Sequence, residues 1–146
     1  MRLIALAAAF VLTAATANAA QLMNIKGDWD VAETMDRLQA AVENAGATVF
    51  ARIDHAAGAA KVGQELAPNQ LLIFGNPKLG TPMMQSSASI GIDLPLKVHI
   101  YKNSAGETVI AYPDMKGLAE EHDVDSPTVG KAAGALEMLI GKATEE

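Results

Sequence analysis

Residues 75–85 combine the residue types most suited to holding a small ligand. Gly75 and Gly80 would let a ligand approach the backbone, and two prolines would stiffen the loop before anything binds. Thr81 followed by Pro82 is typical of a helix start, where unpaired backbone N–H groups attract anions. We therefore expect a site for a small polar or anionic ligand, with four candidate residues: Asn76, Thr81, Gln85 and His55. The alternative is a tight crossover between two strands that needs no ligand.

Nucleotide binding and hydrolase chemistry find no support in the sequence. The loop superficially resembles the phosphate-binding pattern G-x-x-x-x-G-K-[ST], but Gly80 runs directly into Thr81 without the lysine, and Pro77 removes one N–H of the phosphate cradle. No serine lies in a G-x-S-x-G pattern. The chain contains no Cys, which excludes thiolate catalysis, Cys-ligated zinc and iron–sulfur clusters. We accordingly expect no cofactor and no metal.

Three histidines are the remaining candidates for metal binding or acid–base chemistry. His55, His99 and His122 lie far apart in the chain, and no two have the spacing of a metal-ligand pair. Asp54 and His55 fall at a predicted junction of strand and helix, where Asp54 would cap the helix and His55 would bond nearby backbone. The alternative is an enzyme that uses these two residues as an acid–base pair.

Helical periodicity predicts the elements that would position these residues. Asp30 and Glu33 have the pattern of a capping box, and apolar residues follow at spacings of three and four, so a helix is predicted over residues 31–45. Ser126 as N-cap and Pro127 as first helical residue would begin a final helix with one apolar face. Shorter helices are predicted in three places: from Ala56 to between Gly63 and Leu66, from Pro82 onward, and from Pro113 to His122.

Five segments have the composition and alternation of β-strands: residues 21–26, 48–53, 70–74, 96–102 and 107–112. The third is a continuous apolar run, as expected of a buried central strand. In the fourth, Lys97, His99 and Tyr101 alternate with apolar residues, and the turn-forming residues that follow indicate an antiparallel hairpin with the fifth. The order strand, helix, four strands, helix predicts an α+β fold, a β-α-β4-α two-layer sandwich with helices packed on a mixed sheet.

One face of that sheet would lack a covering layer of helices. We place four residues on it: Phe50, Arg52, Phe74 and Tyr101. Because monomers seldom leave large contiguous apolar patches in water, and two-fold pairing is the commonest closed arrangement, we expect a homodimer that buries part of this face. A self-associating interaction module is therefore a further class of function beside ligand binding and catalysis.

Residues 1–19 have the pattern of a secretory signal peptide. Arg2 gives a positive start, an apolar run follows, and Ala17-Asn18-Ala19 supplies an A-x-A cleavage site. The run decays into polar residues, whereas a membrane-spanning helix needs about 20 predominantly apolar ones. Cleavage after Ala19 would leave residues 20–146 as a single domain, periplasmic or secreted and not embedded in a membrane.

The charge balance limits the partners of that domain. The chain has 17 acidic and 11 basic residues and a formal net charge of −6, which becomes −7 once Arg2 is removed. A nucleic-acid partner would need a basic stripe to neutralise phosphates, so we expect no nucleic acid. A small ligand and a second copy of the chain remain the expected partners.

Several runs of residues carry a family likeness: Asp54-His55-Ala56, Gly63, Leu66-Ala67-Pro68, residues 71–77, Gly80-Thr81-Pro82, Met84-Gln85 and residues 93–97. In these runs the chain resembles the bacterial family called domain of unknown function 302 (DUF302), whose fold is also described as TT1751-like. Arg37-Leu38 and the hairpin ending at Tyr112 extend the likeness over most of residues 20–146. The resemblance implies the β-α-β4-α sandwich. It implies no reaction, because the family has no established catalytic set, and no compartment, because many relatives lack an export signal.

Overall fold

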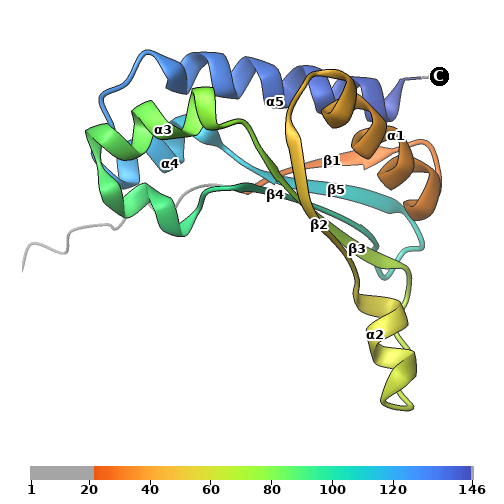
Figure 1. Ribbon diagram of the computed structural model, residues 1–146. Helices are drawn as coiled ribbons and strands as arrows, with labels where there is room; N and C mark the ends of the chain where they lie inside the picture. The colour runs from red at the N-terminus through yellow and green to blue at the C-terminus, as the bar shows by residue number, and fades with distance from the viewer. Residues whose placement is uncertain (1–21, 146) are drawn as a thin grey trace, which may run out of the picture.

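Five strands form a single sheet (Figure 1). The computed structural model describes residues 22–145, so the expected signal peptide over residues 1–19 lies outside the described residues. The strands are β1 (Leu22–Gly27), β2 (Thr48–Asp54), β3 (Asn69–Gly75), β4 (Leu96–Lys102) and β5 (Thr108–Pro113). They lie in the order β1-β5-β4-β3-β2, which confirms the five predicted strands and the hairpin of β4 with β5.

The sheet is antiparallel throughout, so the prediction of a mixed sheet is wrong. Every neighbouring pair of strands runs antiparallel. The chain between β3 and β4 is partly helical, but it leaves one end of β3 and returns to the same end, where Phe74 lies opposite Leu96. Parallel neighbours would need a crossover to the other end. The connection between β1 and β2 does cross the sheet, yet it joins the two edge strands, which are not neighbours.

Helices cover one face of this sheet, which we call the helix side (Figure 1). They are α1 (Val31–Asn44), α3 (Pro77–Ser86), α4 (Met115–Glu121) and α5 (Thr128–Thr144), with a short 3-10 helix, η1 (Ala88–Ile92), after α3. The remaining helix, α2 (His55–Lys61), projects away from the opposite face, which we call the open face (Figure 1). The predicted two-layer α+β sandwich is thereby confirmed.

The hydrophobic core lies between the sheet and the helix layer. α1 contributes Met35 and Leu38, and α5 contributes Leu136 and Ile140, all nearly inaccessible to solvent. They belong to one cluster with buried strand residues: Leu72, Phe74, Val98, Ile100 and Ile110. Full burial of such a side chain stabilises a fold by about 1.5–3 kcal/mol. The apolar stripes predicted for the two long helices therefore face the core as expected.

The first turn of α1 is fixed by side chains that the sequence had singled out. Asp30 Oδ1 accepts a hydrogen bond from the Glu33 N–H at 2.9 Å, which confirms the predicted cap. The Glu33 carboxylate binds Arg37 Nε at 2.7 Å. The Arg37 guanidinium in turn lies 4.0 Å from the centre of the Trp29 ring. These contacts fix the start of α1, the helix that connects edge strand β1 to edge strand β2.

Two other helix boundaries differ slightly from the prediction. α5 begins at Thr128, with Pro127 rather than Ser126 at its cap position, although Ser126 Oγ still accepts from the Thr128 N–H at 3.4 Å. α2 ends at Lys61, before the predicted end between Gly63 and Leu66. No helix within residues 22–145 is long and apolar enough to span a membrane.

A β-bulge in β2 breaks the alternation that the sequence predicted. Val49 lies opposite Phe74 and Ala51 lies opposite Ile73, so Phe50 is an extra residue between two consecutive pairs. A bulge of this kind reverses which face each later residue of the strand occupies. The residues of β2 before and after Phe50 therefore do not follow one alternating pattern.

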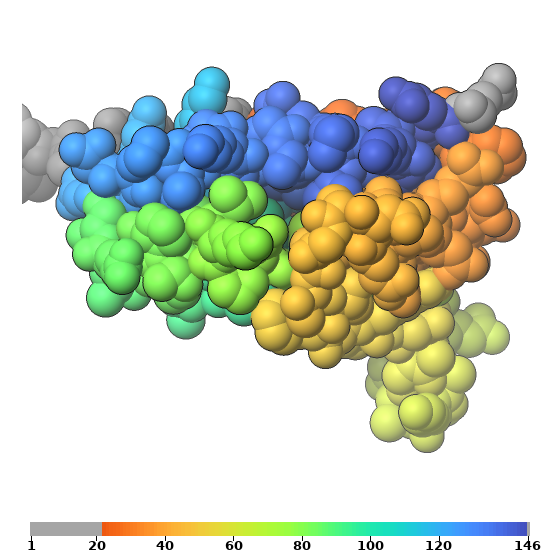
Figure 2. All heavy atoms as spheres, turned by 45° about the horizontal axis from the view of Figure 1, so that its top comes forward, coloured from red at the N-terminus to blue at the C-terminus, as the bar shows by residue number. Residues whose placement is uncertain are grey.

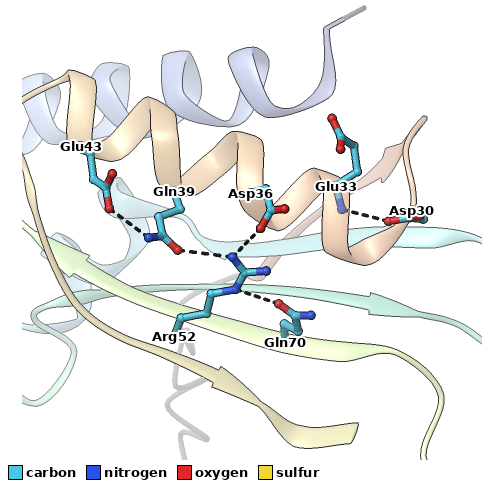
Figure 3. Close-up of polar contacts among 7 residues, drawn as sticks. All are labelled: Asp30, Glu33, Asp36, Gln39, Glu43, Arg52 and Gln70. Atoms are coloured by element: carbon cyan, nitrogen blue, oxygen red, sulfur yellow. Dashed lines mark hydrogen bonds and ion pairs between the residues drawn. The ribbon is translucent and has the colours of Figure 1, made fainter. Parts of the chain in front are cut away.

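Arg52, beyond the bulge, lies on the helix side between α1 and β3 (Figure 3). Its guanidinium pairs with Asp36, lies 3.4 Å from Gln39 Oε1, and donates through Nε to Gln70 Oε1 at 3.0 Å. Phe74 also faces the core, with 2 % of its surface exposed. The single apolar face predicted for the homodimer is therefore wrong, because its members are divided between the two sides of the sheet: Phe50, Arg52, Phe74 and Tyr101.

Candidate functional site

The helix side contains a groove between α3, α5 and the junction of α1 with β2, which we call the apolar groove. Its volume is about 250 Å³. In Figure 2 the surfaces of α3 (green), α5 (blue) and the segment that follows α1 (orange) meet in this region. Its walls are mainly apolar side chains, among them Phe50, Leu79, Met83, Met84, Leu94 and Leu139.

Small side chains leave the space of the groove open. Ala132 and Ala135 of α5 line it where larger residues would fill it. Of the two glycines that the sequence assigned to ligand approach, Gly75 has a packing role, because a Cβ there would lie only 3.2 Å from Pro95 Cβ. A Cβ on Gly80 would make an ordinary contact of 3.6 Å with Leu94 Cδ1.

α3 begins at Pro77, so the prediction that Thr81 caps a helix is wrong. Asn76 is the cap: its Oδ1 accepts from the Lys78 N–H at 3.0 Å, and its carbonyl accepts from the next two N–H groups at 2.9 and 3.0 Å. The Asn76-Pro77 pair supplies the same cap and proline chemistry as the predicted pair, but more than one turn earlier. The first turn therefore has no unpaired donor for an anion, since Pro77 carries no N–H.

The four predicted site residues do not come together. Asn76 and Thr81 line the apolar groove. Gln85 is exposed on α3 outside that lining, and His55 lies on the other side of the sheet. Sequence reasoning missed the apolar walls of the groove, for which the small residues of α5 were the one available signal.

A second hollow lies on the open face, and we call it the open-face trough. Its volume is about 420 Å³. Apolar residues from several strands and from α4 form part of its lining, including Leu71 and Ala111. Four ionisable side chains complete it: His55, Asp93, Lys97 and His99. The strand face that the sequence marked with Lys97, His99 and Tyr101 is thus the open face.

His99 is held in place by three neighbours. Its Nε2 lies 2.7 Å from Asn69 Oδ1, and its ring stacks on Tyr101 with the ring centres 4.7 Å apart. The ring of His55 meets it edge-on at 6.3 Å. Burial, followed by the charge of His55, lowers the pKa of His99 below its ordinary value. The lowered pKa favours the neutral form of the His99 imidazole.

Asp54 and His55 are not arranged as a working acid–base pair. Asp54 Oδ1 accepts from the Ala57 N–H at 2.8 Å and so caps α2, as one of the two sequence interpretations expected. The His55 ring lies against His99 instead. The alternative of an enzyme based on this pair has no support in the geometry.

His122 joins two segments of the structure. Its Nε2 lies 2.8 Å from Asp93 Oδ2, and its Nδ1 lies 3.0 Å from Ser89 Oγ. These contacts fix the end of α4 against the segment that leads into β4. Within residues 22–145, no three His, Asp or Glu side chains gather as a metal-ligand set.

The fold and these two hollows define a small α+β domain with room for ligands on both sides of its sheet. The chain belongs to the family described as Domain of unknown function DUF302, whose family model matches residues 23–143. This finding confirms the resemblance seen in the sequence.

The chain is also similar to parts of two curated bacterial proteins and to a solved structure. The chain is 38% identical over 103 residues, or 70% of its length, to Fluoride-specific ion channel FluC 1 of Brucella suis and to FluC 2 of Brucella melitensis. The match covers 41% and 38% of those two proteins, so the chain spans about two fifths of their length. A crystal structure of an uncharacterized conserved DUF302 protein from Bacillus stearothermophilus has a TM-score of 0.66 at 19% identity, with 84% of this chain and 94% of that one covered. At this identity the likeness shows the fold.

Proposed function

We propose that the protein is a non-enzymatic binding protein that holds a small, mainly apolar ligand in the apolar groove. The observation that supports this is the contrast between apolar walls and the polar groups of Asn76 and Thr81 in the same lining. Binding sites for small molecules commonly combine an apolar lining with a few polar groups that orient the ligand. The ligand is thus more apolar than the polar or anionic one expected from the sequence.

The size of the groove limits the ligand further. Its volume of about 250 Å³ lies just below the range of about 300–1,000 Å³ that is typical of drug-sized ligands. Asn76 Oδ1 is already engaged in capping α3, which leaves the Thr81 hydroxyl as a readily available polar group. A ligand with a body the size of one ring and a single hydroxyl or carbonyl fits these constraints.

Benzyl alcohol and toluene are suitable probes, because they differ in one hydroxyl group. Benzyl alcohol should raise the melting temperature, since a ligand at about 100 times its dissociation constant stabilises a fold by roughly 2.7 kcal/mol. Ala135→Leu should abolish the shift by filling the groove, whereas Lys131→Leu, on an exposed position of the same helix, should keep it. Thr81→Val should remove the preference for benzyl alcohol over toluene.

Two results would contradict the proposal. In one, neither probe changes the melting temperature of the wild type. In the other, Ala135→Leu and Lys131→Leu respond to the probes alike, which would place binding outside the groove.

We further propose that the protein acts after export. Export is supported by the signal-peptide pattern of residues 1–19. Intact mass spectrometry of the exported protein should give a chain that begins at Ala20. A mass that retains residues 1–19 would contradict cleavage at this site.

A second candidate function is an accessory role beside a membrane channel. It is supported by the two Brucella relatives, in which a segment similar to this chain forms part of a protein named as a fluoride-specific ion channel. Deletion of the gene should then increase the sensitivity of the cells to fluoride, and the wild-type gene should restore resistance. Unchanged growth across a fluoride series would exclude this role.

A further inference from the structure

The open-face trough brings one lysine, two histidines and one aspartate together on the side of the sheet opposite the apolar groove. His55, Lys97 and His99 contribute nitrogen groups, and Asp93 is the one acidic residue among the described residues that line the trough. The Asp93 carboxylate is bound by His122 at 2.8 Å, which directs its charge toward α4. Lys97 gives the trough a positive group that can attract an anion.

Lys97 supplies the cation of this trough. It is an exposed residue of β4, and its Nζ lies 3.5 Å from the Ile92 carbonyl oxygen, at the outer limit of a hydrogen bond. A carboxylate would replace this weak contact with a charge-assisted hydrogen bond.

His99 supplies a second and different polar group. An amide oxygen only accepts hydrogen bonds, so the contact with Asn69 Oδ1 places the proton of the neutral ring on Nε2. Nδ1 is then the ring nitrogen that can accept a hydrogen bond from a ligand. Stacking on Tyr101 fixes the orientation of the ring before a ligand arrives.

The spacing of the two groups sets the length of the ligand. Lys97 and His99 lie two residues apart on the same face of β4, and a strand rises about 3.3 Å per residue, so their Cα atoms are roughly 6.6 Å apart. Leu71 and Ala111 lie opposite His99 on the two neighbouring strands and give the trough apolar surface on either side of that residue. A ligand that contacts Lys97, His99 and this apolar surface would carry an anion and a hydroxyl at opposite ends of an apolar body.

We propose that the open-face trough is a binding site for a small hydroxylated organic acid. The carboxylate pairs with Lys97, the hydroxyl donates to His99 Nδ1, and the apolar body lies over Leu71 and Ala111. This site is on the opposite side of the sheet from the apolar groove, and it is independent of the function proposed for that groove.

Three related probes separate the two polar contacts. 4-Hydroxybenzoate carries both groups, benzoate lacks the hydroxyl, and 4-hydroxybenzamide lacks the negative charge. Calorimetric titration of the purified protein should give a preference for 4-hydroxybenzoate over each analogue of about tenfold, as expected for the loss of one hydrogen bond to a charged or oriented group. Backbone chemical-shift changes should fall on β3, β4 and β5 beside the trough.

Single substitutions should remove one preference at a time. Lys97→Met should abolish the preference for the acid over the amide and keep the preference for the hydroxyl. His99→Phe, which retains an aromatic ring for stacking on Tyr101, should abolish the preference for the hydroxyl and keep the preference for the acid over the amide. Lys61→Met, which removes the same charge from exposed α2 outside the trough, should bind like the wild type.

Three results would overturn the proposal. One is the absence of binding of 4-hydroxybenzoate at about 10 mM, a concentration at which even a millimolar site is occupied. Another is equal binding of all three probes. The third is an identical effect of Lys97→Met and Lys61→Met.

Discussion

Single side chains determine the tight turn between β4 and β5. Asn103 Oδ1 accepts from the N–H groups of Ala105 and Glu107 at 3.0 and 2.9 Å, and Asn103 Nδ2 donates to Glu107 Oε2 at 3.2 Å. Lys26 Nζ binds the other oxygen of that carboxylate at 3.0 Å. Hydrogen bonds from Lys26 and Asn103 lower the pKa of Glu107, and the hydrogen bond to Glu107 raises the pKa of Lys26. One carboxylate thus connects the turn to edge strand β1.

Glu107→Gln should destabilise the protein near neutral pH and have little effect in acid. Because the folded-state pKa of Glu107 is lowered, its contribution is present above the ordinary glutamate value of about 4.3 and is lost as the pH falls through the folded value. The raised pKa of Lys26 means that its contribution is lost only as the pH rises above about 10.4. The urea midpoint of the variant should therefore lie below that of the wild type from about pH 6 to 9, and the two should converge toward pH 3.

Glu137→Gln is the matched control for this experiment, because Glu137 is an exposed glutamate on α5. The difference in urea midpoint between Glu137→Gln and the wild type should not shrink in the same way as the pH falls. If the difference in urea midpoint between Glu107→Gln and the wild type is as large at pH 3 as at neutral pH, the contact with Lys26 is not its cause.

At the scale of elements, α2 and the residues after it form an arm that is separate from the core. No residue of α2 is buried, and Val62 just beyond it is 72 % exposed. Pairing of β2 with β3 continues to Asp54 opposite Gln70, at the base of the arm. Pro68 fixes the point where the chain returns from the arm to the sheet, because its carbonyl accepts from the Lys102 N–H at 2.9 Å. The arm is therefore an extension of a strand hairpin that carries little of the fold's stability.

Replacing residues 56–67 with Gly-Gly should leave the fold intact. The replaced segment contributes no buried side chain, and a shorter loop lowers the entropy cost of closure by roughly 0.6 kcal/mol for each halving of its length. The melting temperature should change by only a few degrees, whereas Leu38→Ala in the core should cost about 2–5 kcal/mol. A shortened protein that no longer unfolds cooperatively would show that the arm supports the sheet.

Patterns local in sequence predicted most elements of this molecule, and contacts between distant segments account for the rest. Asp30 caps α1 as expected because the capping carboxylate and the Glu33 N–H that donates to it are only three residues apart. The bulge at Phe50 has no such local signal, since it depends on how β2 meets β3. Asn76 and His55 were assigned to one site, but the sheet separates them, because one follows β3 on the helix side and the other begins an arm on the open face. The apolar groove forms only where three helices and the bulge of β2 meet in the folded chain. The spacing of residues along the sequence does not predict that meeting.

At the scale of the whole molecule, the homodimer stays a prediction. The four residues first expected to form its interface do not share one surface, because they lie on both sides of the sheet. Light scattering at micromolar concentration should give twice the mass of one chain, and a monomer mass would refute pairing. If the open-face trough binds its acid in the dimer, the two copies must meet elsewhere, because pairing across that face would close the trough.

The order of the strands also determines when the molecule can fold. β1, the first strand, pairs with β5 alone, so that Leu22 has Pro113 as its partner. During synthesis from the N-terminus, β1 has no partner until most of the chain has been made. Pairings over such long sequence separations are slow to form, and an unpaired strand edge is open to other chains in the meantime. Completion of the sheet is thus a late event. A chain on a ribosome that stalls before residue 108 has an incomplete sheet, with an unpaired strand edge that can pair with other chains.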